Sequence, residues 1–154
     1  MAIASLKALT VSQPFADLIA DGTKFVENRV WSTSYRGPLA IHAGKGSKYL
    51  SKSELQNYQR GVVVAVCRVI ACVNMQEIAY RRGNDRAGRP ATNAPTWDEI
   101  SRHKHTEGPW CWILADVVKL VDPVACSGSQ GLFSLQGRLL ERIAEQVRGK
   151  IKLT

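Results

Sequence analysis

Charged side chains inside a strand-like stretch are the first sign of chemistry in this sequence. The segment "GTKFVENRVW" (Gly22 to Trp31) carries Lys24, Glu27 and Arg29 among residues that favour a pleated, half-buried surface. Because side chains alternate along a strand, Glu27 and Arg29 share a face, and on a buried face the two charges are expected to pair. Such a pair also offers an acceptor and a fork of donors to a nucleobase edge or a phosphate. We expect the pair to serve both as structure and as a ligand site.

Lys24 has two alternative roles. A lysine in a desolvated pocket is readily pushed toward neutrality and then acts as a base or nucleophile. Glu27 nearby opposes that change, because a negative neighbour favours the charged form. We therefore favour Lys24 as a cationic contact to a phosphate or a carbonyl oxygen. The catalytic alternative is that Lys24 and Glu27 form a general acid/base pair.

Three further candidate contacts lie outside this segment. Ser12 stands at the start of a predicted helix, where it either caps the helix or lies beside a bound phosphate. Tyr35 and Arg36 occupy the short loop "STSYRGP". There the ring either stacks on a base or packs on the rim of the domain, and the guanidinium is placed to pair with phosphate.

The charge balance favours a polyanionic partner. The chain has 21 Lys and Arg against 13 Asp and Glu, a formal charge of +8, which points to nucleic acid first and an anionic membrane surface second. A long Gly-, Pro- and Asn-rich loop at 83–96 is expected to be functional or mobile. Tyr80 and four arginines run into it, and the arginines form either a track for a phosphate backbone or a solvated face: Arg81, Arg82, Arg86 and Arg89.

Histidines and cysteines give no metal-binding pattern. The four cysteines are widely spaced without a CxxC pair, so free thiols are expected. The "HKH" at His103–His105 has no supporting ligand at a suitable spacing and is interpreted as surface, whereas His42 is interpreted as a satisfied core histidine. We expect no metal and no cofactor. No apolar run reaches the roughly 20 residues of a membrane span and no signal peptide is recognised, so we expect a cytoplasmic protein without membrane association.

The elements that must position these residues are short strands and helices without regular βαβ alternation. Strands are predicted at Leu6–Val11, Gly22–Trp31, Gly37–Ala43, Gly61–Val73, Pro109–Val121 and Gly131–Leu135. Helices are predicted after Ser12, from Ser51 with Glu54 as capping box, over 74–83, after Thr96 with Glu99, and as an amphipathic C-terminal helix over 137–149. The sum is an α+β fold, a small and mostly antiparallel β-barrel with short flanking helices and a C-terminal helix, in one domain of residues 1–154.

The same motifs, taken in order, resemble the ASCH domain family of the PUA-like superfamily, from Ser5 to about Leu135. The family pattern is a strand, Ser-x-x-x-Pro before a helix, Gly-x-Lys-x-x-Glu-x-Arg, an aromatic, Tyr-Arg-Gly-Pro-Leu and Ile-His-Ala. This chain offers Gln13-Pro14, Gly22, Lys24, Glu27, Arg29, Trp31, Tyr35-Arg36-Gly37-Pro38, Ile41-His42-Ala43 and, in a closing strand, Gly131-Leu132-Phe133.

The resemblance implies a PUA-like fold and a cleft for RNA or a nucleotide-like ligand, lined by the Gly-x-Lys-x-x-Glu-x-Arg residues. Some related small bacterial members hydrolyse acetylated cytidine with a lysine, a threonine three residues on and a distant glutamate. Here Lys24 matches the lysine, and Glu27 stands where the threonine would be.

Three functions follow as hypotheses, in this order. The first is binding of RNA, single-stranded nucleic acid or a nucleotide. The second is a hydrolase acting on a modified nucleoside or on RNA. The third is a protein-interaction adaptor that docks a partner on the C-terminal helix through Arg138, Arg142 and Arg148.

Overall fold

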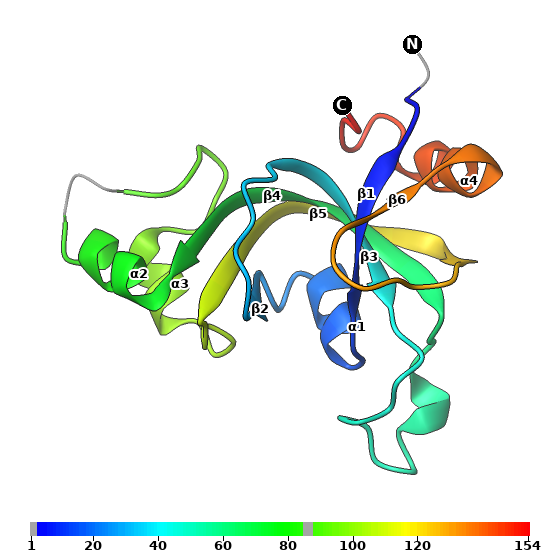
Figure 1. The fold of residues 1–154 in the computed structure, drawn as a ribbon, viewed down its shortest axis with the longest axis horizontal. Coiled ribbons are helices and arrows are strands. Elements are labelled where there is room, and N and C mark those ends of the chain that lie inside the picture. The colour runs from blue at the N-terminus through cyan, green and yellow to red at the C-terminus, as the bar shows by residue number, and fades with distance from the viewer. Residues whose placement is uncertain (1–2, 85–87) are drawn as a thin grey trace. The chain divides into compact units, whose positions relative to one another are not determined.

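A mixed β-sheet with four α-helices forms the described part of the chain, residues 3–84 and 88–154 of a computed structural model (Figure 1). The predicted contact Arg86 lies outside the described residues. In chain order the elements are β1 (Leu6–Val11), α1 (Phe15–Ala20), β2 (Val26–Arg29), β3 (Gly37–Ala43), the 3-10 helix η1 (Leu55–Asn57), β4 (Val62–Asn74), α2 (Met75–Arg82), α3 (Trp97–Arg102), β5 (Trp110–Ala125), β6 (Phe133–Leu135) and α4 (Gly137–Val147).

The sheet is open and mixed, so the predicted barrel is wrong, while the α+β class is confirmed. The six strands are hydrogen-bonded in the order β2-β5-β4-β3-β1-β6, and within the described ranges β2 and β6 are the two edges. The register of β1 is parallel to β3 and antiparallel to β6. Local sequence predicts a strand and its faces but not its partner. A parallel pair also needs a crossover, which the stretch containing α1 and β2 supplies here.

The described residues form two compact units, which we call the first and the second unit. The first unit comprises residues 3–23, 38–67 and 117–154, and the second comprises 24–37, 68–84 and 88–116. Strands β4 and β5 each contribute one end to each unit. Each unit has a hydrophobic core of its own.

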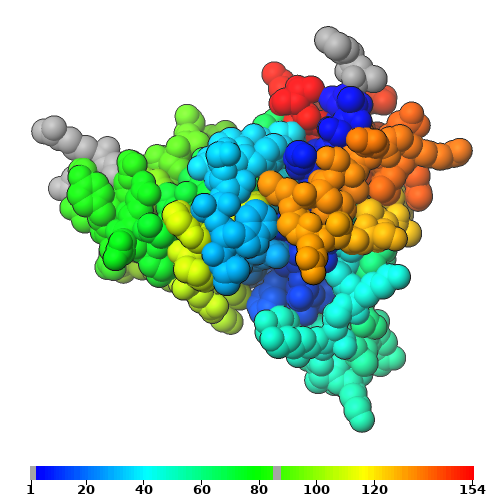
Figure 2. All heavy atoms as spheres, in the orientation of Figure 1, coloured from blue at the N-terminus to red at the C-terminus, as the bar shows by residue number. Residues whose placement is uncertain are grey.

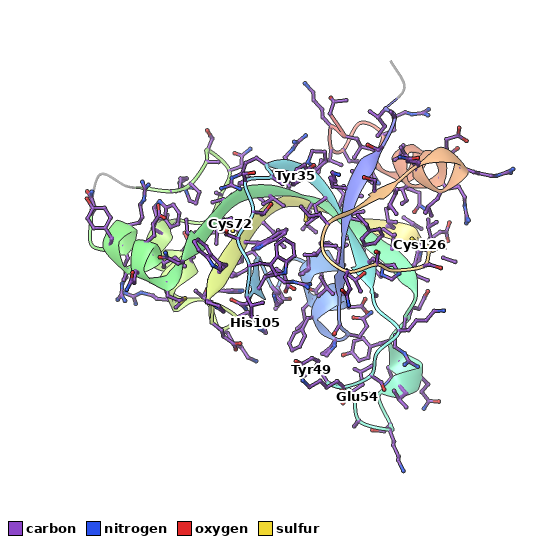
Figure 3. All side chains as sticks on the ribbon, in the orientation of Figure 1. Tyr35, Tyr49, Glu54, Cys72, His105 and Cys126 are labelled. Atoms are coloured by element: carbon purple, nitrogen blue, oxygen red, sulfur yellow. The ribbon has the colours of Figure 1, made fainter. Side chains whose placement is uncertain are left out.

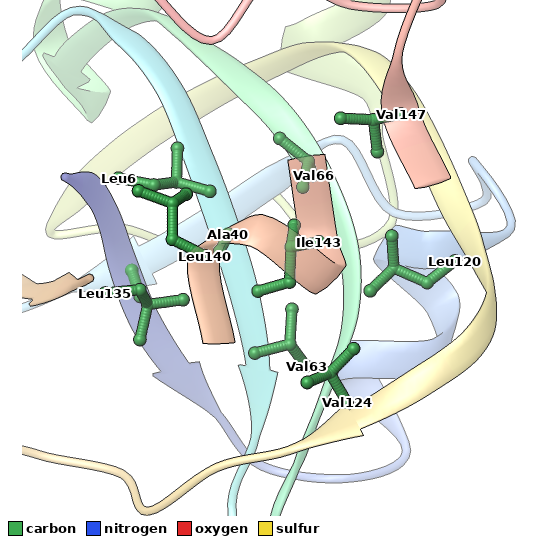
Figure 4. Packing of buried hydrophobic residues seen from close by; sticks show 11 residues of the cluster. Leu6, Ala40, Val63, Val66, Leu120, Val124, Leu135, Leu140, Ile143 and Val147 are labelled. Atoms are coloured by element: carbon green, nitrogen blue, oxygen red, sulfur yellow. The ribbon is translucent and has the colours of Figure 1, made fainter. Parts of the chain in front are cut away.

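The core of the first unit gathers side chains from β1, β3, β4, β5 and β6 under helix α4 (Figure 4). The predicted amphipathic character of α4 is confirmed, because Leu140, Ile143 and Val147 are buried while Arg138 and Arg142 are exposed. Burying an aliphatic side chain of this size stabilises a fold by about 1.5–3 kcal/mol. Helix α4 is therefore part of the core of this unit.

The start of α1 depends on Gln13 rather than on Ser12. The predicted Ser12 cap is wrong, since Pro14 occupies the N-cap position and makes no side-chain cap bond. The buried Gln13 amide instead accepts from the Asp17 backbone N–H at 3.0 Å. Its Nε2 donates to the Asp17 carboxylate and to the Gln59 carbonyl, both at 2.8 Å. An amide that is a donor and an acceptor at once thus fixes the helix start and a distant loop.

The core of the second unit joins β2, β4 and β5 to helices α2 and α3, which lie side by side (Figure 1). Its buried members are Val26, Ala71, Val73, Ile78, Trp97, Ile100, Cys111 and Ile113. The predicted capping box of α3 is confirmed: Glu99 N–H donates to Thr96 Oγ1 at 3.1 Å, and Thr96 N–H to the Glu99 carboxylate at 3.3 Å. This core supports the strand that carries the candidate site.

The helix predicted to begin at Ser51 is only the 3-10 turn η1, which begins at Leu55, although the Glu54 carboxylate does accept from the Ser51 N–H at 3.0 Å. No helix in the described ranges is long and apolar enough to cross a bilayer.

Candidate functional site

Strand β2 separates its side chains between the core and an opposite face. It pairs antiparallel with β5, so that Glu27 lies opposite Trp112 and Asn28 opposite Cys111. Residues paired in this way point to the same side of a sheet. The even-numbered residues of β2 therefore face the apolar core of the second unit with Cys111, and Glu27 lies on the other face beside Trp112.

On that other face, Lys24, Glu27 and Arg29 form a chain of ion pairs, which we call the triad. Lys24 Nζ lies 2.8 Å from Glu27 Oε1, and Arg29 Nη2 and Nε lie 2.8 and 3.0 Å from Glu27 Oε2. The Lys24 ammonium also donates to the Val26 carbonyl. The expected pairing of Glu27 with Arg29 is thus found, and Lys24 joins it from the loop before the strand.

The triad is largely enclosed, and Arg29 is its member nearest to solvent. The side chains of Lys24 and Glu27 are 4% and 10% exposed, against 24% for Arg29. Charges this buried are tolerated only when they are paired and hydrogen-bonded. Two cations around one carboxylate leave a net formal charge of +1 at this position, which favours an anionic ligand approaching from the side of Arg29.

Two tryptophans continue this face beyond Glu27. The Trp31 ring packs edge-to-face on Trp112 with ring centroids 4.9 Å apart and an interplanar angle of 89°. Trp112 is fully buried, and its indole Nε1 has no hydrogen-bond partner among the described residues. Trp31 is only half-buried, so it presents aromatic surface close to the triad strand.

The "HKH" segment lies against β2, contrary to the expectation of a solvated surface. The His103 ring stacks on Phe25 with centroids 3.8 Å apart, and its Nε2 accepts from the Phe25 N–H at 3.4 Å. The His105 ring lies 5.5 Å from that of His103. His105, labelled in Figure 3, precedes β5 in the chain, and its carbonyl accepts from Asn28 Nδ2 of β2. In Figure 2 the yellow-green segment lies against the light-blue segment that follows β2. Sequence reasoning missed this because only tertiary contact shows it.

Burial and the triad together set the charge of these two histidines. Burial lowers the pKa of His103, and the charges of His105 and Lys24 lower it further. The pKa of His105 is lowered by burial first and then by Lys24 and Lys104, against opposing effects of Glu107 and Glu27. Both imidazoles are therefore mainly uncharged at neutral pH.

The other predicted contacts make bonds within the protein. The exposed Arg36 guanidinium donates to the Thr33 and Tyr35 carbonyls at 3.1 and 2.8 Å, and Tyr35 itself is half-buried. On the helices, Arg82 pairs with Asp98 at 3.4 Å, and Arg89 in the loop donates to the Ala94 carbonyl at 3.2 Å.

Ser12 is half-buried in the first unit, whereas the triad belongs to the second. No three His, Cys, Asp or Glu side chains of residues 3–84 and 88–154 gather as metal ligands would. Of the predicted site residues, the structure joins Lys24, Glu27 and Arg29 by direct contact.

These observations define a class of protein with an α+β fold, in which a largely buried Lys–Glu–Arg triad lies at an edge strand of the sheet. The family model of the ASCH domain matches residues 9–123, most of the chain. The chain belongs to the ASCH domain family, as the sequence motifs indicated.

Solved structures of similar fold agree with this assignment. The chain resembles ASCH from Zymomonas mobilis at 15% identity and a TM-score of 0.53, over 90% of this chain and 93% of that one. Two point mutants of that protein, one with a serine changed to alanine and one with a tyrosine changed to phenylalanine, are each 16% identical to this chain. They give TM-scores of 0.51 and 0.53 over 90% of this chain and 94% and 96% of theirs. At these identities the likeness concerns the fold. No curated protein matches the sequence.

Proposed function

We propose that this protein binds RNA or single-stranded nucleic acid and holds one nucleotide against the triad. One observation carries the proposal: a nearly enclosed carboxylate is bonded on both sides by cations, and the outer cation, Arg29, reaches solvent. Purely structural ion pairs are poor stabilisers when buried, because desolvation offsets their attraction. The arrangement is better explained as a preorganised charged site than as a stabilising device. Membership in the ASCH family and the formal charge of +8 point the same way.

The chemistry of the triad suits a nucleotide. A guanidinium carries five N–H groups in a fixed fork and recognises phosphate or a base edge bidentately. Trp31 adds a half-buried ring, and stacking of a base on such a ring is worth about 1–3 kcal/mol. Exposed arginines such as Arg36, Arg82 and Arg89 would then contribute contacts to phosphates along the bound nucleic acid.

Fluorescence anisotropy with labelled single-stranded RNA and DNA oligonucleotides tests this function. We expect measurable affinity at about 50 mM salt that falls with a log-log slope of about −0.7 per phosphate contacted. Arg29→Gln should weaken binding at least several-fold, whereas the matched control Arg142→Gln, on the exposed face of α4, should not. Undetectable binding of both oligonucleotides at low salt would overturn the proposal.

Hydrolysis is a second candidate function, favoured by one distance. Lys24 Nζ and Glu27 Oε1 lie 2.8 Å apart, so a substrate atom within hydrogen-bond reach of one group would lie close to the other member of a candidate general acid/base pair. Turnover of acetylated cytidine or of labelled RNA by the wild type but not by Lys24→Ala would support it. If the purified protein leaves both substrates intact with divalent metal present, the protein is a binding domain only.

A further inference from the structure

A long basic loop joins β3 to β4 within the first unit, and we call it the 44–61 loop. All of its residues are described, and η1 is its one regular element. Loops longer than about 12–15 residues are uncommon in compact domains, and they usually carry a function or are disordered. Its cations are all exposed and face a single acid of the same loop, Glu54: Lys45, Lys48, Lys52 and Arg60. The loop therefore offers a positive surface to an anionic ligand.

Hydrogen bonds close the 44–61 loop and attach it to the start of α1. The buried Gln13 amide donates to the Gln59 carbonyl at 2.8 Å. The Arg60 guanidinium joins the two ends of the loop, since it donates to the Lys45 carbonyl at 2.8 Å. The exposed side chains between these ends are thus held in a defined arrangement, which lowers the entropic cost of binding a ligand.

A β-turn in this loop presents Lys48 and Tyr49 at the surface. The Leu50 N–H donates to the Ser47 carbonyl at 3.0 Å, so Lys48 and Tyr49 are the two central residues of the turn. The Tyr49 ring packs on Phe15 of α1 with ring centroids 5.1 Å apart and an interplanar angle of 69°. Lys48 Nζ lies 5.3 Å from the centroid of the same ring. Figure 3 labels Tyr49, and in Figure 2 the teal segment of the loop lies next to the blue segment of α1.

Tyr49 remains open to solvent although its ring is anchored. Its side chain packs on Phe15, yet the residue is 51% exposed. Proteins that hold single strands combine such an exposed aromatic ring, which stacks on a base, with cations that contact the phosphates. A single strand is favoured over a duplex, because only unpaired bases are free to stack on a side chain.

We propose that Tyr49 and Lys48 form a second contact site for single-stranded nucleic acid, in which Tyr49 stacks on a base and Lys48 pairs with a neighbouring phosphate. The inference rests on the proposed function, because the ligand is the same nucleic acid. It adds a contact site in the first unit to the triad of the second unit.

The test is fluorescence anisotropy with a labelled oligouridylate of about 12 nucleotides, a length within the usual site size for single strands. Tyr49→Leu, which keeps an apolar side chain without a ring, should weaken binding at least about fivefold. Tyr49→Phe keeps the ring and should bind within about twofold of the wild type. The matched control Arg142→Gln, on the exposed face of α4, should bind like the wild type.

Salt dependence separates the role of the ring from the role of the charge. Lys48→Gln should reduce the log-log salt slope by about 0.7, because one phosphate contact is lost. Tyr49→Leu should leave that slope unchanged, since stacking releases no counterion. Equal slopes for Lys48→Gln and the wild type would overturn the phosphate contact of Lys48.

An abasic strand of the same length tests whether Tyr49 contacts a base. Tyr49→Leu should bind this strand as tightly as the wild type does, because there is no base to stack, whereas Lys48→Gln should still bind it more weakly. Equal weakening of both strands by Tyr49→Leu would overturn the stacking role. Melting curves establish that the variants are folded, and if Tyr49→Leu is not, the ratio of uridylate to abasic affinity in Tyr49→Ser against Tyr49→Phe decides the same question.

The outcomes distinguish this inference from the proposed function. Oligouridylate binding that is weakened by Arg29→Gln but not by Tyr49→Leu would overturn the second site and leave the proposed function standing. Release of Tyr49→Leu from phosphatidylserine vesicles, with unchanged oligouridylate affinity, would also overturn it and assign the loop to a membrane surface. Absence of oligouridylate binding by the wild type at low salt would overturn the proposed function itself.

Discussion

At the scale of single residues, Glu27 is the residue on which the candidate site depends. Its carboxylate is bonded to a lysine that is 3% exposed and to an arginine that is partly solvated. Removing one partner of a buried pair costs about 3–5 kcal/mol, since the other charge is left uncompensated. Glu27→Gln therefore combines a loss of stability with any loss of binding. Arg29 is the better residue for separating the two, because its side chain is more exposed.

The first residue-scale prediction concerns the energetics of the triad. Glu27→Leu should lower the free energy of unfolding by about 3–5 kcal/mol, and Arg29→Leu by clearly less, because Lys24 still neutralises Glu27. Urea denaturation measures both. The double variant Lys24→Met with Glu27→Leu should be more stable than Glu27→Leu alone, since no deeply buried charge remains unpaired. If the destabilisation of the double variant equals the sum of the destabilisations measured for Lys24→Met and Glu27→Leu singly, the two charges are not coupled.

The second residue-scale prediction concerns thiol reactivity. Burial raises the pKa of the Cys67 thiol to about 12, so almost no thiolate exists at pH 8, and the thiolate is the reactive form. Alkylation of the native protein should leave Cys67 unmodified, whereas the half-buried Cys72 should react. In guanidinium chloride both should react at similar rates. Peptide mass spectrometry measures each site, and rapid native labelling of Cys67 would contradict its burial.

At the scale of elements, helix α4 was one hypothesis for a docking site, and the structure shows it as part of a hydrophobic core. Its apolar stripe is packed in the first unit, so the adaptor hypothesis is left only with the exposed basic face of the helix. Deleting the chain after Gly137 would remove part of a core and unfold this unit, and therefore does not test docking. Charge reversal at Arg138, Arg142 and Arg148 is the appropriate test of an adaptor role, since these side chains are exposed.

The element-scale prediction is that Ile143→Ala destabilises the protein strongly. Ile143 is fully buried in the first-unit core, and truncating such a residue to alanine costs about 2–5 kcal/mol. The control Arg142→Ala, one residue away on the exposed face, should change stability by no more than about 0.5 kcal/mol. Chemical denaturation followed by circular dichroism measures both, and equal effects would contradict the packing of α4.

At the scale of the whole molecule, two cores are connected by continuous strands. Strands β4 and β5 each run from one unit into the other. Losing the order of a strand in one unit should therefore weaken the other as well, and the chain should unfold in one cooperative transition.

The positions of the tryptophans make this cooperativity measurable. All four, Trp31, Trp97, Trp110 and Trp112, belong to the second unit, so their fluorescence reports on that unit alone. Ile143→Ala alters the first unit, yet it should shift the fluorescence transition and the circular dichroism transition by the same amount. A fluorescence midpoint that stays at the wild-type value would show that the two units unfold independently.

Sequence predicted the local features of this fold well, because periodicity and capping act over a few residues. The bounds of β1 and β3, the capping box at Thr96 and the amphipathic α4 match the structure. His42 was interpreted as a satisfied core histidine, and it is buried with hydrogen bonds to Thr10 Oγ1 and the Cys126 carbonyl. The ASCH motifs identified the family for the same reason, since their order along the chain is itself a sequence property.

Tertiary structure alone decided the strand partners and the neighbours of the triad. The parallel pairing of β1 with β3 joins residues about 30 positions apart, and Asn28 binds residues nearly 80 positions away. No short-range preference encodes such contacts, because they depend on how the whole chain buries its apolar faces. The alternation "ENR" determined which charges share a face; only the folded chain determined that the histidine segment lies against Phe25 and Asn28.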